Sequence, residues 1–180
     1  MKTYIALLRG INVSGQKKVP MAELKACLEE LSYRNVRTYI QSGNVVFQKA
    51  DASPAQLEKQ IEDQLLARFG FQVPTLVKEP PELEYVLNHN PFLREGKDPD
   101  RLYLTFLADT PAAERVALLD EVDYSPEAFV LDGKNIFFFS PSGYGRAKMN
   151  NNFFEQKLKV DATTRNWRTV NRLWEMAGEE

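Results

Sequence analysis

The same order of predicted elements occurs twice along the chain: strand, helix, strand, strand, helix, strand. Short runs of apolar and β-branched residues predict the strands, and apolar residues at intervals of three and four predict the helices. In the first copy we predict a strand at 4–8, a helix from Pro20, strands at 36–40 and 44–47, a helix from Ser53 and a strand at 73–77. Such an order predicts an α+β fold in which neighbouring strands pair antiparallel.

The second copy repeats the order of elements without repeating the residues. We predict a strand at 102–107, a helix from Thr110 to about 120, a hairpin of 129–131 and 136–139, a helix at 149–158, an extended piece at 161–164 and a final helix from about 165 to 177. Each copy matches the ferredoxin-like arrangement of two helices on an antiparallel sheet. We therefore expect a tandem pair of ferredoxin-like units with a C-terminal helix: a first lobe at 1–78, a connector with a short helix at 79–100 and a second lobe at 101–180.

Composition indicates that the chain folds and where in the cell it is located. The chain has 180 residues, of which 43% are hydrophobic, so it is long enough to bury a sizeable core. Its one cysteine, Cys27, cannot form an intramolecular disulfide, and the N-terminus leads directly into a predicted strand instead of an apolar signal segment. Charged residues interrupt every run that approaches the length of a membrane helix. We expect a cytoplasmic protein that neither spans a membrane nor is secreted.

The formal net charge of -2 hides opposite charges along the chain. Residues 1–49 carry 8 Lys and Arg against 3 Asp and Glu, and residues 140–174 carry 7 against 2. Residues 50–139 carry 8 against 17. Charge asymmetry of this kind bears on partners and solubility, not on fold. The two basic segments are therefore candidates for an anion-binding region, and ordinary solvated lysines and arginines are the alternative.

Two glycine-containing loops lie where a strand leads into a helix. The loop 9–18 contains two glycines and is flanked by Arg9, Lys17 and Lys18, so its backbone N–H groups could bind an anion. Its spacing does not match a P-loop, because Gln16 follows the second glycine and no Ser or Thr follows the lysines. The loop 143–148 combines glycine, tyrosine and two cations. The alternative for the loop 9–18 is a mobile loop that binds no ligand. The polar turn 41–44 between two predicted strands is a further candidate, and its alternative is an ordinary hairpin turn.

The predicted C-terminal helix separates an apolar face from a basic one. Trp167, Val170, Leu173 and Trp174 share one side, and Arg165, Arg168 and Arg172 lie near the opposite side. A row of guanidinium groups suits phosphate or carboxylate, and a solvated polar face is the alternative.

Several chemistries are unsupported by the residues. Cys27 lies on or beside the apolar face of the first helix, and His89 is the only histidine. With no cluster of histidine and cysteine, we predict no metal site, no histidine-based triad and no cofactor. Tyr144 and Lys148 are the only acid or base candidates, so whether the protein is an enzyme stays open.

Three motifs resemble a known family: Leu8-Arg9-Gly10-Ile11-Asn12-Val13, Thr38-Tyr39-Ile40-Gln41-Ser42-Gly43-Asn44 and Ala162-Thr163-Thr164-Arg165-Asn166-Trp167-Arg168-Thr169. On these motifs, with 143–146 and Lys148 as a further block, the chain is similar to the bacterial family called domain of unknown function 1697, from about residue 4 to 173. The resemblance implies a two-lobed α+β protein and brings no activity, substrate or cofactor. Its motifs coincide with the polar segments described above. The predicted ligand-binding residues are Arg9, Gly10, Asn12, Lys17, Tyr39, Gln41, Ser42, Asn44, Tyr144, Arg146, Lys148, Thr164, Arg165, Asn166 and Arg168.

Three functions compete on these observations. The first is binding of a small anionic or phosphate-bearing ligand in a cleft built from both lobes. The second is nucleic-acid binding on the sheets, against which the acidic middle segment and the pI of about 5.6 argue. The third is an enzyme of unknown reaction that uses neither metal nor Cys/His chemistry. The sequence does not predict the oligomeric state, and a scaffold or protein-interaction role is a further alternative, as for any such domain.

Overall fold

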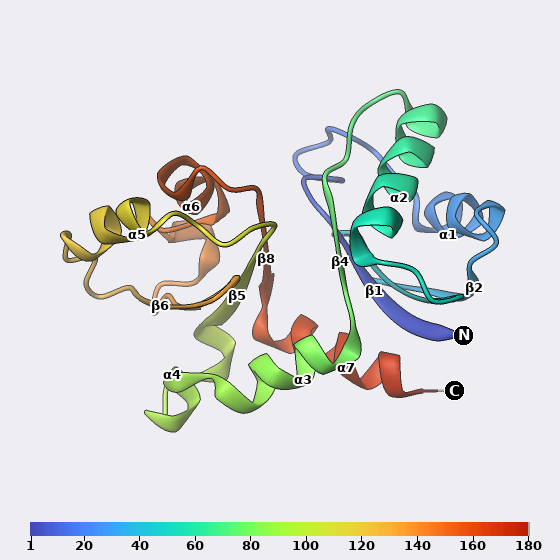
Figure 1. Ribbon diagram of the computed structural model, residues 1–180. Coiled ribbons are helices and arrows are strands. Elements are labelled where there is room, and N and C mark those ends of the chain that lie inside the picture. The colour runs from blue at the N-terminus through green and yellow to red at the C-terminus, as the bar shows by residue number, and fades with distance from the viewer. Residues whose placement is uncertain (180) are drawn as a thin grey trace. The chain divides into compact units, whose positions relative to one another are not determined.

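The computed structural model describes residues 1–179, which form two compact units (Figure 1). Unit 1 consists of Met1–Glu84 together with the segment from Arg172, and unit 2 is Tyr85–Asn171. Unit 1 contains β1 (Lys2–Leu8), α1 (Met21–Glu30), β2 (Arg34–Tyr39), β3 (Asn44–Lys49), α2 (Pro54–Phe69) and β4 (Thr75–Lys78). Two elements are divided between the units: α3 (Pro80–His89) and α7 (Trp167–Gly178).

The sheet of unit 1 has the strand order β2-β3-β1-β4, and every neighbouring pair is antiparallel. Alternate residues of β1 point to one face, where Tyr4, Ala6 and Leu8 join the core with α1 and α2. Figure 1 shows both helices on this same face of the sheet. The apolar spacing that predicted the helices is therefore the spacing of their buried residues.

The start and end of α2 follow from local signals in the sequence. The Ser53 side chain accepts a hydrogen bond from the Gln56 backbone N–H, and the Gln56 side chain accepts one from the Ser53 backbone N–H. Pro54 occupies the first turn, and Gly70 ends the helix in a left-handed conformation with φ of 76°. The predicted capping box and glycine stop are confirmed.

Unit 2 has the strand order β6-β7-β5-β8, again antiparallel throughout. Its complete elements are β5 (Leu102–Leu107), α4 (Pro91–Arg94), α5 (Ala113–Asp120), β6 (Ala128–Asp132), β7 (Asn135–Phe139), α6 (Asn151–Leu158) and β8 (Ala162–Asn166), with short 3₁₀ turns at Pro99–Arg101 and Tyr144–Arg146. Its core joins β5 and β7 to α6 through rings such as Tyr103, Phe138 and Phe154. With two four-stranded antiparallel sheets and their helices, the predicted α+β class is confirmed.

The prediction for the C-terminal helix was wrong in two respects. The helix begins at Trp167, and Arg165 lies in β8, where it is paired in register with Leu104. Because Arg165 is in a strand, it does not share a helical row with Arg168 and Arg172. Trp174 falls on the apolar face by its spacing, but it is 40% exposed.

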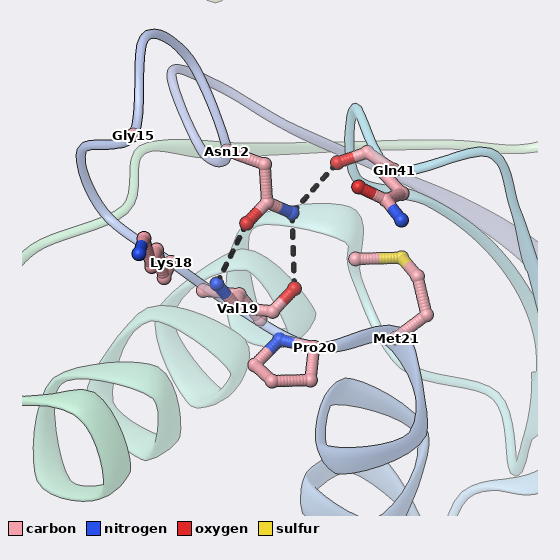
Figure 2. A pocket seen from close by; sticks show the side chains of 7 residues that line it. All are labelled: Asn12, Gly15, Lys18, Val19, Pro20, Met21 and Gln41. Carbon is pink, nitrogen blue, oxygen red and sulfur yellow. Dashed lines mark hydrogen bonds between the residues drawn. The ribbon is translucent and has the colours of Figure 1, made fainter.

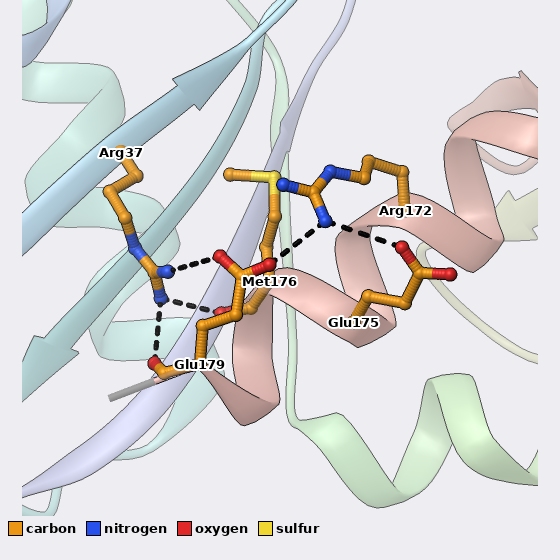
Figure 3. A network of polar contacts seen from close by, with 5 residues as sticks. All are labelled: Arg37, Arg172, Glu175, Met176 and Glu179. Carbon is orange, nitrogen blue, oxygen red and sulfur yellow. Dashed lines mark hydrogen bonds and ion pairs between the residues drawn. The ribbon is translucent and has the colours of Figure 1, made fainter.

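Arg37 of β2 holds the last turn of α7 (Figure 3). Its guanidinium donates to the backbone carbonyls of Met176 and Glu179 and, at 3.0 Å, to the Glu179 carboxylate. Arg172 donates to the other oxygen of that carboxylate at 2.9 Å. The last carbonyls of a helix have no partner within the helix. The guanidinium of Arg37 supplies donors here and so stabilises this end of α7.

We expect Arg37→Ala to loosen the end of α7 without unfolding unit 1. The substitution removes the donor to the Met176 carbonyl of α7 and to the Glu179 carbonyl just after it, so backbone amide exchange around Met176 should accelerate about tenfold. Hydrogen exchange resolved by residue measures this effect. Arg34→Ala, an exposed position on the same strand, is the control, and equal exchange in the two variants would contradict the role of Arg37.

Candidate functional site

Eight of the predicted site residues lie at one end of the sheet of unit 1. The end of β1 lies beside the start of β3, where Leu7 pairs with Asn44, and the end of β2 lies beside the same residue, where Tyr39 pairs with Asn44. The loop that follows β1 and the β2–β3 turn therefore meet at this end. The residues brought together are Arg9, Gly10, Asn12, Lys17, Tyr39, Gln41, Ser42 and Asn44.

Asn12 connects the two segments (Figure 2). Its Nδ2 donates to the backbone carbonyl of Val19 at 2.9 Å and to that of Gln41 at 2.8 Å. Its Oδ1 accepts from the Val19 backbone N–H at 2.8 Å. These three bonds use both protons of the carboxamide and its oxygen. Asn12 therefore fixes the walls of the site and has no N–H proton left for a ligand.

A cavity of about 330 Å³ lies beside this connection. Asn12, Lys18 and Gln41 are its polar lining residues, and Pro20 and Met21 bring the start of α1 to it. Pro20 is the N-cap of α1 and has no side-chain capping bond to the first turn. The residues that line the cavity are Asn12, Gly15, Lys18, Val19, Pro20, Met21 and Gln41.

The path of the loop decides which lysine reaches the cavity. Asn12, Ser14 and Lys17 all have positive φ, of 55°, 51° and 45°. Non-glycine residues seldom adopt this left-handed conformation, so the loop turns sharply along its length. Lys17 extends to the backbone carbonyl of Gln72, to which its Nζ donates at 2.8 Å. Lys18 lines the cavity instead, although it was not among the predicted ligand contacts.

The β2–β3 turn is held by its own side chains. Asn44 is fully buried, and its Nδ2 donates to the Tyr39 carbonyl at 3.0 Å and to Ser42 Oγ at 2.9 Å. Gly43 has φ of 85°, and its carbonyl accepts from the Leu8 backbone N–H. These contacts give Ser42 and Asn44 a structural role in the turn that presents Gln41.

Ile40 is the strained residue of this turn. It has φ of 48° and is 49% exposed. A β-branched residue in the left-handed region costs energy, and backbone strain of this kind clusters at functional sites.

Two of the predicted site residues of unit 2, Tyr144 and Thr164, belong to a separate polar network around the start of α6. The Tyr144 hydroxyl accepts from the Asn151 backbone N–H at 2.9 Å, and Thr164 donates to Asn151 Oδ1 at 2.9 Å. Thr105 of β5 and Thr164 of β8 also share a hydrogen bond across the sheet. This network fixes the loop 143–148 to the strands.

The cationic residues of unit 2 are placed in different ways. Arg165 is 8% exposed, and its Nη1 donates to Thr163 Oγ1 and to the Thr164 carbonyl. Burial lowers the pKa of its guanidinium to about 10. Arg168 is exposed and forms an ion pair with Asp100, and the backbone N–H of Lys148 donates to Glu127. Arg146 lies in the short 3₁₀ turn, and Asn166 accepts from the Thr169 N–H at the start of α7. The expectation that both sets line one cleft stays a prediction.

Metal-ligand clusters, the cysteine and the length of the helices can be described for residues 1–179. No group of three or more His, Cys, Asp or Glu in this range is placed to hold a metal ion. Cys27 is fully buried in the core, and burial raises the pKa of its thiol, which disfavours the reactive thiolate. No helix in the same range is long and apolar enough to cross a membrane.

The nucleic-acid alternative would need exposed aromatic rings on a sheet. The central strands do not offer them: β5 is buried along its whole length, and β1 is buried from Tyr4 to Leu8. Phe47 of β3 and Phe138 of β7 are at most 1% exposed. These strands therefore provide no stacking platform.

Comparison with known proteins gives a family but no activity. A solved structure of a conserved bacterial protein from Streptococcus pneumoniae is 27% identical to this chain with a TM-score of 0.76, and the similarity covers 97% of this chain and 98% of that one. No curated protein matches the chain. The family described as "Protein of unknown function (DUF1697)" matches residues 1–137. Since this match spans most of the sequence, the protein belongs to the DUF1697 family.

Proposed function

We propose that the protein binds a small anionic ligand in the cavity of unit 1. The observation that carries this proposal is the position of Lys18, whose side chain lines a cavity that also contains the start of α1. The positive end of a helix and an ammonium group both favour negative charge. No Asp or Glu is among the residues that line the cavity.

The first turn of α1 strengthens this electrostatic preference. Its N-cap, Pro20, supplies no side-chain acceptor, so backbone N–H groups of the first turn keep their capacity to bind an anion. Glu23 lies in the same turn and is exposed, which reduces the local positive potential in part. The ammonium of Lys18 is therefore the main source of attraction for a ligand.

We expect Lys18→Met to weaken anion binding about fivefold, because it removes the single full positive charge among the lining residues while keeping an unbranched side chain. Thermal unfolding with increasing sodium phosphate, sulfate or acetate measures the effect, since a ligand that binds only the folded state raises Tm. Lys25→Met, on the exposed face of α1, is the control. The proposal is refuted if the anions stabilise both variants equally, or if they stabilise neither the variants nor the parent protein.

We also propose a fold type, a cellular location and a bacterial origin for the protein. A tandem of ferredoxin-like units is supported by the matching strand orders β2-β3-β1-β4 and β6-β7-β5-β8, each with two helices between strands. The division into lobes at 1–78 and 101–180 remains part of this proposal. A cytoplasmic location is supported by the single free, buried Cys27, and a bacterial origin by the relative from Streptococcus pneumoniae.

A further inference from the structure

We infer that the cavity of unit 1 selects a small monocarboxylate with a second hydrogen-bonding group and a short apolar arm, in preference to a phosphate ester. This inference rests on the proposed function, because it specifies the anion that the same cavity binds. It follows from three properties of the lining residues: their charge, the room they enclose and the position of their polar and apolar atoms.

The charge of the cavity matches one negative charge. Lys18 is the single cationic residue among those that line it, because Lys17 extends to the Gln72 carbonyl. A phosphate ester carries nearly two negative charges at pH 7 and is typically bound by guanidinium groups. No arginine is among the lining residues. The desolvation of a dianion would therefore be less well compensated here than that of a carboxylate.

The volume of the cavity suits a small ligand. Its volume of about 330 Å³ lies at the lower end of the range for small-molecule sites. A branched 2-oxo acid is of a size that suits this volume, and a nucleotide would extend beyond the lining residues.

The Gln41 carboxamide supplies the second polar contact. Figure 2 shows that the backbone carbonyl of Gln41 accepts a hydrogen bond from Asn12, while the side-chain carboxamide of Gln41 extends separately into the pocket. Both N–H protons of Asn12 bind backbone carbonyls, so Gln41 is the residue that can donate a hydrogen bond to the ligand. A carboxamide both donates and accepts, and can therefore bind a carbonyl or a hydroxyl beside the carboxylate.

The remaining lining residues of the cavity favour a short apolar group on the ligand. Val19, Pro20 and Met21 contribute aliphatic and thioether groups to the lining. In Figure 2 the Met21 thioether extends into the same pocket as the Gln41 carboxamide. A thioether adapts to the shape of small apolar groups, so a short branched chain would fill this part.

The test compares four probes by isothermal titration and by NMR shifts of the backbone amides at 12–21 and 41. The probes are 2-oxoisovalerate, isovalerate, isobutyl phosphate and the neutral amide of 2-oxoisovalerate. We expect 2-oxoisovalerate to bind about fivefold more tightly than isobutyl phosphate, and the neutral amide to bind most weakly. Lys18→Met should weaken the binding of both acids about fivefold, and Lys25→Met should change neither.

Gln41→Leu tests the second contact separately. Asn12 binds the backbone carbonyl of Gln41, so replacing the side chain keeps the hydrogen bond that holds the turn. The variant should lose the preference for 2-oxoisovalerate over isovalerate and retain the binding of isovalerate. Thermal unfolding confirms that each variant is folded.

The outcomes separate the two claims. If isobutyl phosphate binds as tightly as 2-oxoisovalerate or more tightly, and binding depends on Lys18, the inference is overturned while the proposed function stands. An unchanged preference for the 2-oxo group in Gln41→Leu also overturns the inference. If no anion binds, or if binding leaves the amides at 12–21 unshifted, both claims fail.

Discussion

Gly43→Ala is expected to lower the free energy of unfolding by about 3 kcal/mol. An alanine Cβ at this position would lie 2.6 Å from Leu8 Cβ and 2.9 Å from Ile11 Cδ1. Both neighbours belong to the buried core, so neither can move aside without disturbing β1. The backbone also has φ of 85°, which an L-residue with a side chain adopts only under strain. Chemical denaturation followed by far-UV circular dichroism measures the loss.

Gly15→Ala separates the clash from the backbone conformation. Gly15 has φ of 74°, close to that of Gly43, but no heavy atom lies within 4 Å of the position that an alanine Cβ would occupy. We expect a loss of only about 1 kcal/mol, from the left-handed conformation alone. Similar losses in the two variants would show that Leu8 and Ile11 do not restrict the turn.

Asn12→Ala is expected to cost about 3 kcal/mol and to abolish ligand binding by the cavity. The substitution removes two donors and one acceptor, and it leaves both backbone groups of Val19 without their Asn12 partner. Val19 is 1% exposed, so water does not readily replace these bonds. The loop and the β2–β3 turn would separate, because Asn12 joins them through the Gln41 carbonyl. Denaturation gives the stability, and NMR titration with 2-oxoisovalerate gives the binding.

Asn35→Ala is a matched control for this substitution. Asn35 also has positive φ, 49° against 55° for Asn12, so both variants place alanine in the left-handed region. The Asn35 side chain makes one exposed hydrogen bond, to Gln48. We expect it to cost about 1 kcal/mol and to leave binding unchanged. A cost for Asn12→Ala no greater than this would contradict the role of Asn12 in joining the two segments.

The sequence predicts the fold best where a local signal decides the structure. Ser53, Gln56 and Gly70 determine the ends of α2 through bonds within one or two turns, and the structure contains them all. The polar end of the sheet was also predictable, because the loop after β1 and the β2–β3 turn follow from the order of elements. The order of elements therefore places the two segments that contain Asn12 and Gln41 at the same end of the sheet.

What the sequence did not predict depends on backbone geometry and on distant partners. Lys17 and Lys18 are indistinguishable as neighbouring cations, and the positive φ of Lys17 and the Gln72 carbonyl decide which one reaches the cavity. Arg165 fits a helical row by spacing, but Thr163, Thr164 and Arg165 pair with β5 and extend the strand. Asn166 was a usable signal for the start of α7, since its side chain caps the Thr169 N–H.

Unit 1 is discontinuous in sequence, and this affects the order in which it can form during translation. The segment from Arg172 joins Met1–Glu84 only after all of unit 2 has been synthesised. Until then Arg37 lacks the carbonyls of Met176 and Glu179. A ribosome adds about 5–20 residues per second, so several seconds or more separate the synthesis of β2 from that of the segment from Arg172. Vectorial synthesis therefore allows unit 1 to complete its fold only after the residues of unit 2 have been synthesised.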